Sequence, residues 1–388
     1  MKISSTAMKM MKHNEMSIPE FGTDIIGQEK AKVILSNIFT SRRVPHAFLF
    51  FGPEGTGKFF TALEFLKLIN SGLEGDSAQK QKKVLSALSE PALKLIFPLP
   101  RGKSETGDDS AYDKLSQGVI ETIPEQIGML ASDPYHKMTV PGANTIKISS
   151  IRDIKKFTTF SNETGFKKGV IILDADEMAD EAQNALLKSL EEPPEDVIFF
   201  LITSNKEQLL PTIHSRCWQV KFNPLSNDQV KLILIKHFGI EEAKARLLAS
   251  FSDGSLKNAI DLMKYDLDTI LLTAVQTIRF SLARKFYLAN KVIEEGIDLN
   301  DKEHVRFFIS AILKWLKDVN KHKYTSEIDS FGDFKDTIEK FNQKFNNSDI
   351  ASAILKIEQF TKMIDNNLNL NIILLGIIFE LSALSIRK

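Results

Sequence analysis

The sequence has a single cysteine, Cys217, and no long apolar run. One cysteine excludes an internal disulfide framework and a multi-cysteine zinc site, and it fits a reducing compartment. No early segment is apolar enough for a signal peptide, and the most apolar C-terminal run, 372–379, is far too short to span a bilayer. These absences predict a cytoplasmic protein without a membrane segment and without a metal site, since no two histidines lie at metal-ligand spacing.

An excess of either charge is also missing, because 50 basic residues balance 50 acidic ones. Attraction of the whole molecule to nucleic acid or to an anionic membrane is therefore excluded, and any such contact must be local. The basic pairs Lys155-Lys156 and Lys167-Lys168 could touch DNA phosphates, although such pairs are more often solvated surface charges. With 388 residues, 43% of them hydrophobic, the chain is long enough for two or three domains.

The first half of the sequence alternates strand and helix patterns. Short apolar runs in HAFLFFG (46–52), Val170–Leu173 and Val197–Ile202 predict buried parallel strands. Helical spacing follows in GKFFTALEFLKLI (57–69) and in NALLKSLEEPP (184–194). Asp180 and Gln183 are expected to act as cap and reciprocal partner at the start of the second helix. These patterns predict an α/β domain.

Two other regions differ in texture. Residues 73–140 are polar apart from LKLIFPLP, and we interpret them as an insertion that carries surface loops. After residue 222 the pattern is helical, with short helices expected at 227–238, 241–252 and 255–263 and longer ones beyond. The sequence therefore predicts an α/β domain over 1–222, a small helical lid over 223–266 and an all-α domain over 267–388.

The stretch GPEGTGK (52–58) has the G-x-x-x-x-G-K spacing of a phosphate-binding loop, and it lies between a strand and a helix. Its glycines allow close backbone approach, and Lys58 can reach β and γ phosphates. The alternative is a tight strand-to-helix turn without a ligand. Phe59 stands where a Ser or Thr hydroxyl would bind magnesium. The loop can still bind phosphate, but hydrolysis should suffer.

Five stretches carry a family resemblance by their order and spacing: IIGQEKAK, HAFLFFGPEGTGK, NALLKSLEEPP, FFLITSN and HSRC. The chain resembles bacterial clamp-loader subunits of the AAA+ class, and among these it looks like the delta-prime type of DNA polymerase III, with the gamma and tau types as rivals. The resemblance is strong over residues 20–222 and fair over the lid to about 265. Beyond that point only the helical pattern is shared.

The resemblance implies a nucleotide site, whose binding residues would be Gly52, Gly55, Thr56, Gly57, Lys58, Asp174, Thr203 and Lys257. Family ATPases end the strand before NALLK with an Asp-Glu pair that serves magnesium and water. That pair falls on Leu173 and Asp174 here, or on Asp174 and Ala175 if the register moves by one, so it is incomplete in either case. The intact pair Asp176-Glu177 is interpreted as solvated loop charge.

Two further positions would report on nucleotide in the family. Thr203 or Ser204 corresponds to a polar sensor beside the γ phosphate. Lys257 replaces a family Arg and loses its planar grip on phosphate. ATP or ADP is therefore expected to be weakly held or absent.

The HSRC stretch is intact, and the resemblance makes Arg216 an arginine finger for ATP on a neighbouring subunit. The alternative is an arginine paired with a local carboxylate. Cys217 fits a small buried apolar residue. Delta-prime and gamma subunits commonly carry a four-cysteine zinc module that this chain lacks, so no zinc is expected.

The resemblance implies a scaffold and finger donor with little or no ATPase of its own. Its partners would be gamma or tau and delta subunits, and through the complex the sliding clamp and primed DNA. The first alternative is a working gamma- or tau-type ATPase, or another AAA+ remodeller, in which Lys58, Asp174 and Thr203 suffice for turnover. The second is a nucleotide-independent adaptor of some other complex.

Overall fold

The computed structural model describes residues 21–102, 109–159, 165–364 and 369–385. The chain divides into two compact units, one comprising Met1–Gln229 with Gly254–Lys257 and the other Val230–Asp253 with Asn258–Lys388. The second unit combines most of the expected lid with the C-terminal helices. The division into three domains therefore stays a prediction.

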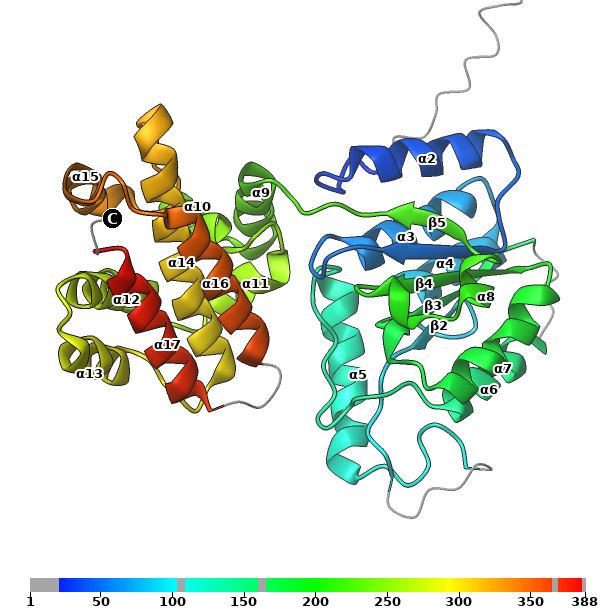
Figure 1. Cartoon of the computed structure of the whole chain (residues 1–388). Coiled ribbons are helices and arrows are strands. Elements are labelled where there is room, and N and C mark those ends of the chain that lie inside the picture. The colour runs from blue at the N-terminus through cyan, green and yellow to red at the C-terminus, as the bar shows by residue number, and fades with distance from the viewer. Residues whose placement is uncertain (1–20, 103–108, 160–164, 365–368, 386–388) are drawn as a thin grey trace, which may run out of the picture. The chain divides into compact units, whose positions relative to one another are not determined.

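The first unit contains a parallel sheet of five strands in the order β2-β3-β4-β1-β5 (Figure 1). The strands are β1 (Ala47–Phe51), β2 (Leu93–Ile96), β3 (Lys168–Ile172), β4 (Val197–Thr203) and β5 (Trp218–Lys221). Strand β1 pairs with β4 on one side, with Ala47 opposite Phe199, and with β5 on the other. The strands expected from the three apolar runs are confirmed.

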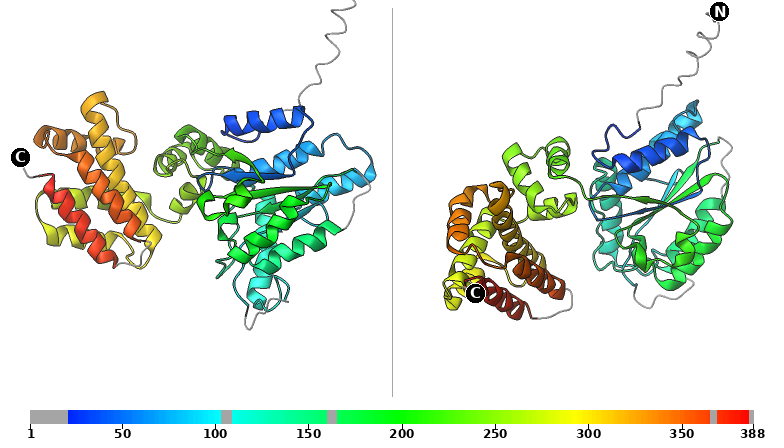
Figure 2. Two further views of the ribbon diagram at one scale, coloured as in Figure 1. Left: turned by 45° about the vertical axis from the view of Figure 1, so that its right-hand side comes forward. Right: turned by 45° about the horizontal axis from the view of Figure 1, so that its top comes forward.

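Helices cover both faces of this sheet (Figures 1 and 2). They are α2 (Glu29–Thr40), α3 (Lys58–Ile69), α4 (Asp76–Ser86), α5 (Gln117–Ser132), α6 (Ile148–Thr159), α7 (Asp180–Glu191) and α8 (Pro211–His214), with 3-10 turns η1 (Ala175–Glu177) and η2 (Lys206–Gln208). Alternate residues of β1 enter different cores, because successive strand side chains point to opposite faces. Phe48 packs with Phe65 of α3, whereas Leu49 lies in the cluster of Leu186 of α7. The α/β class is confirmed.

Residues 73–140 are more than surface loops, so that interpretation is corrected. The segment contains α4, α5 and strand β2, which pairs with β3 at Leu93 and Gly169. Helix α5 buries Val119, Ile123 and Leu130. The apolar stretch LKLIFPLP thus supplies the edge strand of the sheet. Because β2 is only four residues long, its apolar pattern was too short to predict a strand.

The expected cap of α7 is also wrong. The helix begins at Asp180, but its N-cap is Ala179 and makes no side-chain cap hydrogen bond. Gln183 is buried instead: its amide nitrogen donates to the carbonyl oxygens of Met178 at 3.1 Å and Gln208 at 3.2 Å. Its side-chain oxygen accepts from the Leu210 N–H at 2.8 Å. Gln183 therefore fixes the loop after β4 rather than the helix start.

Lys168 contradicts its interpretation as a surface charge. The side chain is 2% exposed, with Nζ 3.2 Å from Asp196 Oδ2 and 5.6 Å from the centre of the Phe157 ring. Buried charges are retained where they are paired. Lys168 is therefore unavailable to DNA phosphates, although its neighbour Lys167 lies at the surface.

The second unit is helical, and the short helices at 227–238, 241–252 and 255–263 are confirmed within one residue. Its helices, two of which begin in the first unit, are α9 (Asn227–Phe238), α10 (Glu242–Phe251), α11 (Leu256–Leu262), α12 (Leu267–Leu282), α13 (Phe286–Gly296), α14 (Lys302–Thr325), α15 (Lys335–Lys344), α16 (Ile350–Met363) and α17 (Leu370–Ala383), with the 3-10 turn η3 (Gly332–Phe334).

The apolar C-terminal run 372–379 lies in α17, which buries Ile373 and Ile377 but leaves Ile372 69% and Phe379 53% exposed. No helix in the described part of the chain has the length and apolar character to span a bilayer.

Candidate functional site

The candidate nucleotide site lies where β1, β3 and β4 end, which is the edge at which ligands bind in parallel α/β sheets. The loop from β1 to α3 carries the glycines and Lys58. A cavity of about 100 Å³ is lined by six of the predicted residues: Gly55, Thr56, Gly57, Lys58, Asp174 and Lys257. Gly52, Thr203 and Arg216 are not among its lining residues. The fold thus brings most of the predicted nucleotide site together.

Lys58 is turned toward its own loop. Its Nζ donates to the carbonyl oxygens of Gly52 at 2.8 Å and Pro53 at 2.6 Å, and the residue is 7% exposed. Burial lowers the pKa of Lys58 to about 8, against the opposing pull of the nearby Glu54, Asp174 and Asp176 carboxylates. The ammonium group that would contact a phosphate in this loop therefore donates to backbone carbonyl oxygens of the loop itself.

Close packing of the backbone explains two of the loop glycines without any ligand. Gly52 has φ 141°, and a Cβ there would lie 2.1 Å from the carbonyl oxygen of Phe222. Gly55 has φ 70°, and a Cβ there would lie 2.5 Å from the backbone nitrogen of Lys257. The Gly55 carbonyl oxygen also accepts a hydrogen bond from the Leu256 N–H at 3.1 Å. Only glycine fits such close backbone approaches. The tight-turn alternative therefore has direct structural support.

The magnesium position offers no oxygen ligand from the residues that should supply it. Phe59 and Leu173 are buried in the core that α3 covers. Thr61 donates its hydroxyl to the Gly57 carbonyl at 2.8 Å, inside its own helix. Among the described residues, no group of three or more His, Cys, Asp or Glu side chains is arranged to hold a metal ion. The absence of zinc stays a prediction, for which elemental analysis is the check.

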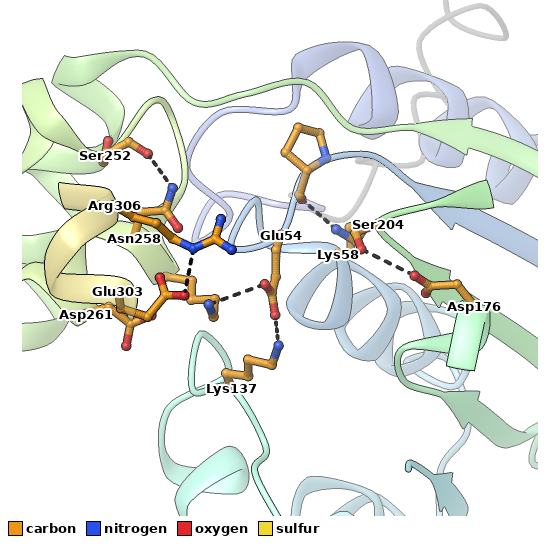
Figure 3. A network of polar contacts seen from close by, with 12 residues as sticks. Glu54, Lys58, Lys137, Asp176, Ser204, Ser252, Asn258, Asp261, Glu303 and Arg306 are labelled. Atoms are coloured by element: carbon orange, nitrogen blue, oxygen red, sulfur yellow. Dashed lines mark hydrogen bonds and ion pairs between the residues drawn. The ribbon is translucent and has the colours of Figure 1, made fainter. Parts of the chain in front are cut away.

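Asp176 is not the solvated loop charge that the sequence suggests. It accepts a hydrogen bond from Thr203 Oγ1 at 2.7 Å. Its other carboxylate oxygen lies 3.5 Å from Ser204 Oγ (Figure 3). Ser204, the alternative sensor residue, lines the cavity, whereas Thr203 is fully buried. Asp174 follows β3 in a left-handed conformation with φ 47°, and burial raises its pKa. The acidic and polar groups thus bond to one another at the ends of β3 and β4.

Sequence reasoning missed three residues of this site. Glu54, inside the glycine loop, pairs with Lys257 at 3.6 Å and with Lys137 (Figure 3). Tyr135 packs over the loop: its ring lies 5.4 Å from that of Phe60, and its Cε1 is 3.3 Å from the point where a Gly57 Cβ would be. Glu54 could have been noticed as an acidic residue in an anion-binding loop. Tyr135 and Lys137 gave no such signal, because they lie far away in the sequence.

Arg216 lies between α8 and β5, with its side chain 33% exposed. Its guanidinium donates to Glu191 Oε1 at 2.7 Å and to the Thr212 carbonyl at 3.0 Å. A local carboxylate partner, which the alternative requires, is therefore present, and the finger role stays a prediction. Cys217 beside it is buried, and burial raises the pKa of its thiol to about 12, so it is no nucleophile.

The strand order and the glycine loop between β1 and α3 give the first unit the architecture of an AAA+ P-loop domain. A family profile described as "DNA polymerase III, delta subunit" matches residues 27–226. The chain belongs to this family, and the resemblance to DNA polymerase III clamp-loader subunits is confirmed.

Individual relatives carry several subunit names. The chain is 27% identical over 250 residues to DNA polymerase III subunit tau of Bacillus subtilis (strain 168), covering 63% of this chain and 37% of that protein. It is 28% identical over 242 residues to subunit delta' of the same organism, covering 62% of this chain and 60% of that protein. Less than two thirds of each relative is thus covered.

A solved structure of a DNA polymerase III gamma subunit-related protein from Thermotoga maritima is also similar to this chain. The two are 17% identical with a TM-score of 0.41, and the match covers 90% of this chain and 98% of that one.

Proposed function

We propose that this chain is a delta-prime-type subunit of a DNA polymerase III clamp loader. It acts as a scaffold and as a donor of Arg216 to the ATP site of a neighbouring gamma or tau subunit, and it has little or no ATPase activity itself. The observation that carries the proposal is the contrast between a nucleotide loop without magnesium ligands at Phe59 and Leu173 and a partly exposed Arg216. Magnesium neutralises the charge that develops in phosphoryl transfer, so its loss should abolish turnover.

Exposed apolar residues of the second unit support assembly with other subunits. Leu355 of α16 is 62% exposed, and Ile372 and Phe379 of α17 are 69% and 53% exposed. All three lie on α16 and α17, which pack against each other, and apolar residues that gather on a protein surface are typical of interfaces. Delta and gamma or tau subunits are the proposed partners, and the sliding clamp and primed DNA are reached through the complex.

The alternative function is a working gamma- or tau-type ATPase. One observation favours it: the Thr203–Asp176 hydrogen bond keeps a carboxylate at the end of β4, near Ser204 and the cavity. A carboxylate there could orient water. Without a metal ligand at position 59, however, this carboxylate lacks the ion with which it would act.

Reconstitution tests the proposal. The purified chain should hydrolyse ATP no faster than a buffer control, and it should enter a complex with gamma or tau and delta subunits on gel filtration. That complex should load the clamp onto primed DNA, and omission of this chain should abolish loading. ATPase activity of the isolated chain would support the alternative, and failure to assemble would favour an adaptor of another complex.

A further inference from the structure

The segment 133–138 is built to stay in place beside the glycine loop. Asp133 accepts a hydrogen bond from the Tyr135 N–H at 3.0 Å through its side chain and from the His136 N–H at 2.9 Å through its carbonyl. Gln126 of α5 adds a contact of 3.0 Å between its Oε1 and His136 Nε2, and the same oxygen accepts from the Thr139 N–H at 3.0 Å. These bonds fix the segment as a turn anchored to α5.

That turn narrows the space above the loop. Tyr135 contacts Gly57 and Phe60, as described above, and it lines the cavity together with Pro134, His136 and Lys137. The cavity that remains beside the loop is about 100 Å³, whereas sites for small molecules are typically about 300–1,000 Å³. As the side chains stand, this cavity is therefore smaller than a typical nucleotide site.

The charges of the site are already matched within the chain. The Glu54 carboxylate pairs with Lys137 and Lys257, and Lys58 is held by backbone carbonyls. Glu54 thus already supplies a negative charge beside Lys137 and Lys257, and this charge repels phosphate. A neighbouring hollow of about 540 Å³ has room for a ligand, but it is lined by the four carboxylates of Glu54, Asp174, Asp176 and Glu177.

We propose that residues 133–138 and Glu54 form an internal plug that closes the phosphate-binding loop to nucleotides. Tyr135 covers the backbone at Gly57, and Glu54 neutralises Lys137 and Lys257 in place of a phosphate. The proposal concerns the isolated chain and does not depend on the role in clamp loading, so either can fail without the other.

A first test uses the wild-type chain. Brief acylation followed by peptide mass spectrometry measures how fast each lysine reacts. Lys58 should react at least about tenfold more slowly than the exposed Lys30 on α2, and millimolar ATP should leave its rate unchanged, with or without Mg²⁺. Protection of Lys58 by ATP would overturn the proposal, because it would show that nucleotide enters the loop.

A second test opens the plug with the double variant Glu54→Gln/Tyr135→Ala. A fluorescent ATP analogue should bind the wild-type chain with a Kd above about 1 mM and the variant at least about tenfold more tightly. Lys58 should also become at least about fivefold more reactive. The matched control is Glu64→Gln/Tyr112→Ala, which changes the same residue types away from the cavity. A folded double variant with neither gain, or micromolar binding by the wild-type chain, would refute the plug.

Discussion

The glycine loop and the Arg216 turn are both predicted parts of a nucleotide site, yet their charged side chains differ in exposure and in partners. In the loop, Lys58 bonds to backbone carbonyls and Glu54 pairs with Lys137 and Lys257. In the turn, Arg216 is partly exposed and pairs with the more exposed Glu191. An exposed ion pair stabilises a protein by only about 0–1 kcal/mol, so it can be exchanged for another anion at little cost. This contrast fits the proposal that the chain offers Arg216 to a neighbouring subunit while its own loop stays closed to nucleotides.

The largest expected effect is at Arg216. Arg216→Ala in a reconstituted loader should leave assembly intact and slow ATP hydrolysis at the affected interface by on the order of 10³ or more, since arginine fingers contribute that much. Total turnover should fall less, because other interfaces retain their own fingers. Arg216→Lys should also be impaired, because an ammonium lacks the planar fork. The measurement is clamp- and DNA-stimulated ATPase after gel filtration.

Glu191→Gln provides the matched control, since it breaks the same ion pair but leaves the guanidinium. If Arg216 acts on a neighbour's ATP, this variant should keep nearly full hydrolysis. Equal losses in Arg216→Ala and Glu191→Gln would instead show that the pair is structural. Unchanged hydrolysis and clamp loading in Arg216→Ala would remove the finger assignment altogether.

The second prediction asks whether the loop glycines serve packing. Gly52→Ala should destabilise the first unit by about 2–4 kcal/mol, because the new Cβ meets the Phe222 carbonyl in a strained backbone conformation. Gly72→Ala is the control, since a Cβ there has nothing within 4 Å. Urea unfolding followed by circular dichroism measures both. Equal midpoints for the two variants would show that the loop relaxes around the methyl group.

The third prediction concerns the cost in folding free energy of burying the positive charge of Lys58. The pKa of Lys58 is lowered from 10.5 to about 8. Folding therefore disfavours its charged form: the penalty is complete below pH 8 and disappears as the pH rises toward 10.5. Lys58→Met should raise the free energy of unfolding at pH 7 by on the order of 1–3 kcal/mol, less what the two lost carbonyl bonds contribute.

This gain should shrink between pH 8 and pH 10, where the wild-type lysine loses its proton in the folded state. Lys67→Met, at a more exposed position on α3, is the matched control for loss of a lysine side chain. Denaturant unfolding at several pH values decides the matter. A variant that is less stable than the wild type at pH 7 would mean that the carbonyl bonds outweigh the burial of the charge.

Sequence patterns were informative where they depended on local periodicity. The apolar runs that became β1, β3 and β4 and the helical spacing of α3 are local signals, and GPEGTGK lies where the motif predicts. Contacts between segments that lie far apart in the chain leave no periodic pattern in the sequence. Tyr135 reaches Gly57 across many residues, and β2 gave only a four-residue apolar run.

Polar side chains were the other difficulty. Gln183 and Asp180 match a capping pattern, but a buried amide can satisfy distant backbone groups equally well, as Gln183 does. Asp176 was misinterpreted for a similar reason: its partner Thr203 lies on another strand. A single sequence identifies a polar residue but not its partner.

The smallest expected effect completes the comparison. Lys58→Ala should change the clamp-loading rate of the reconstituted complex by less than about twofold, since the lysine contacts its own loop and apolar Phe59 and Leu173 stand at the expected magnesium positions. The equivalent substitution in whichever partner subunit hydrolyses ATP serves as the positive control and should abolish loading. The measurement is the rate of clamp transfer to primed DNA at saturating ATP. A loss comparable to the positive control, together with turnover by the isolated wild-type chain, would show that Lys58 binds phosphate productively and that the loop, not the Arg216 turn, carries this chain's chemistry.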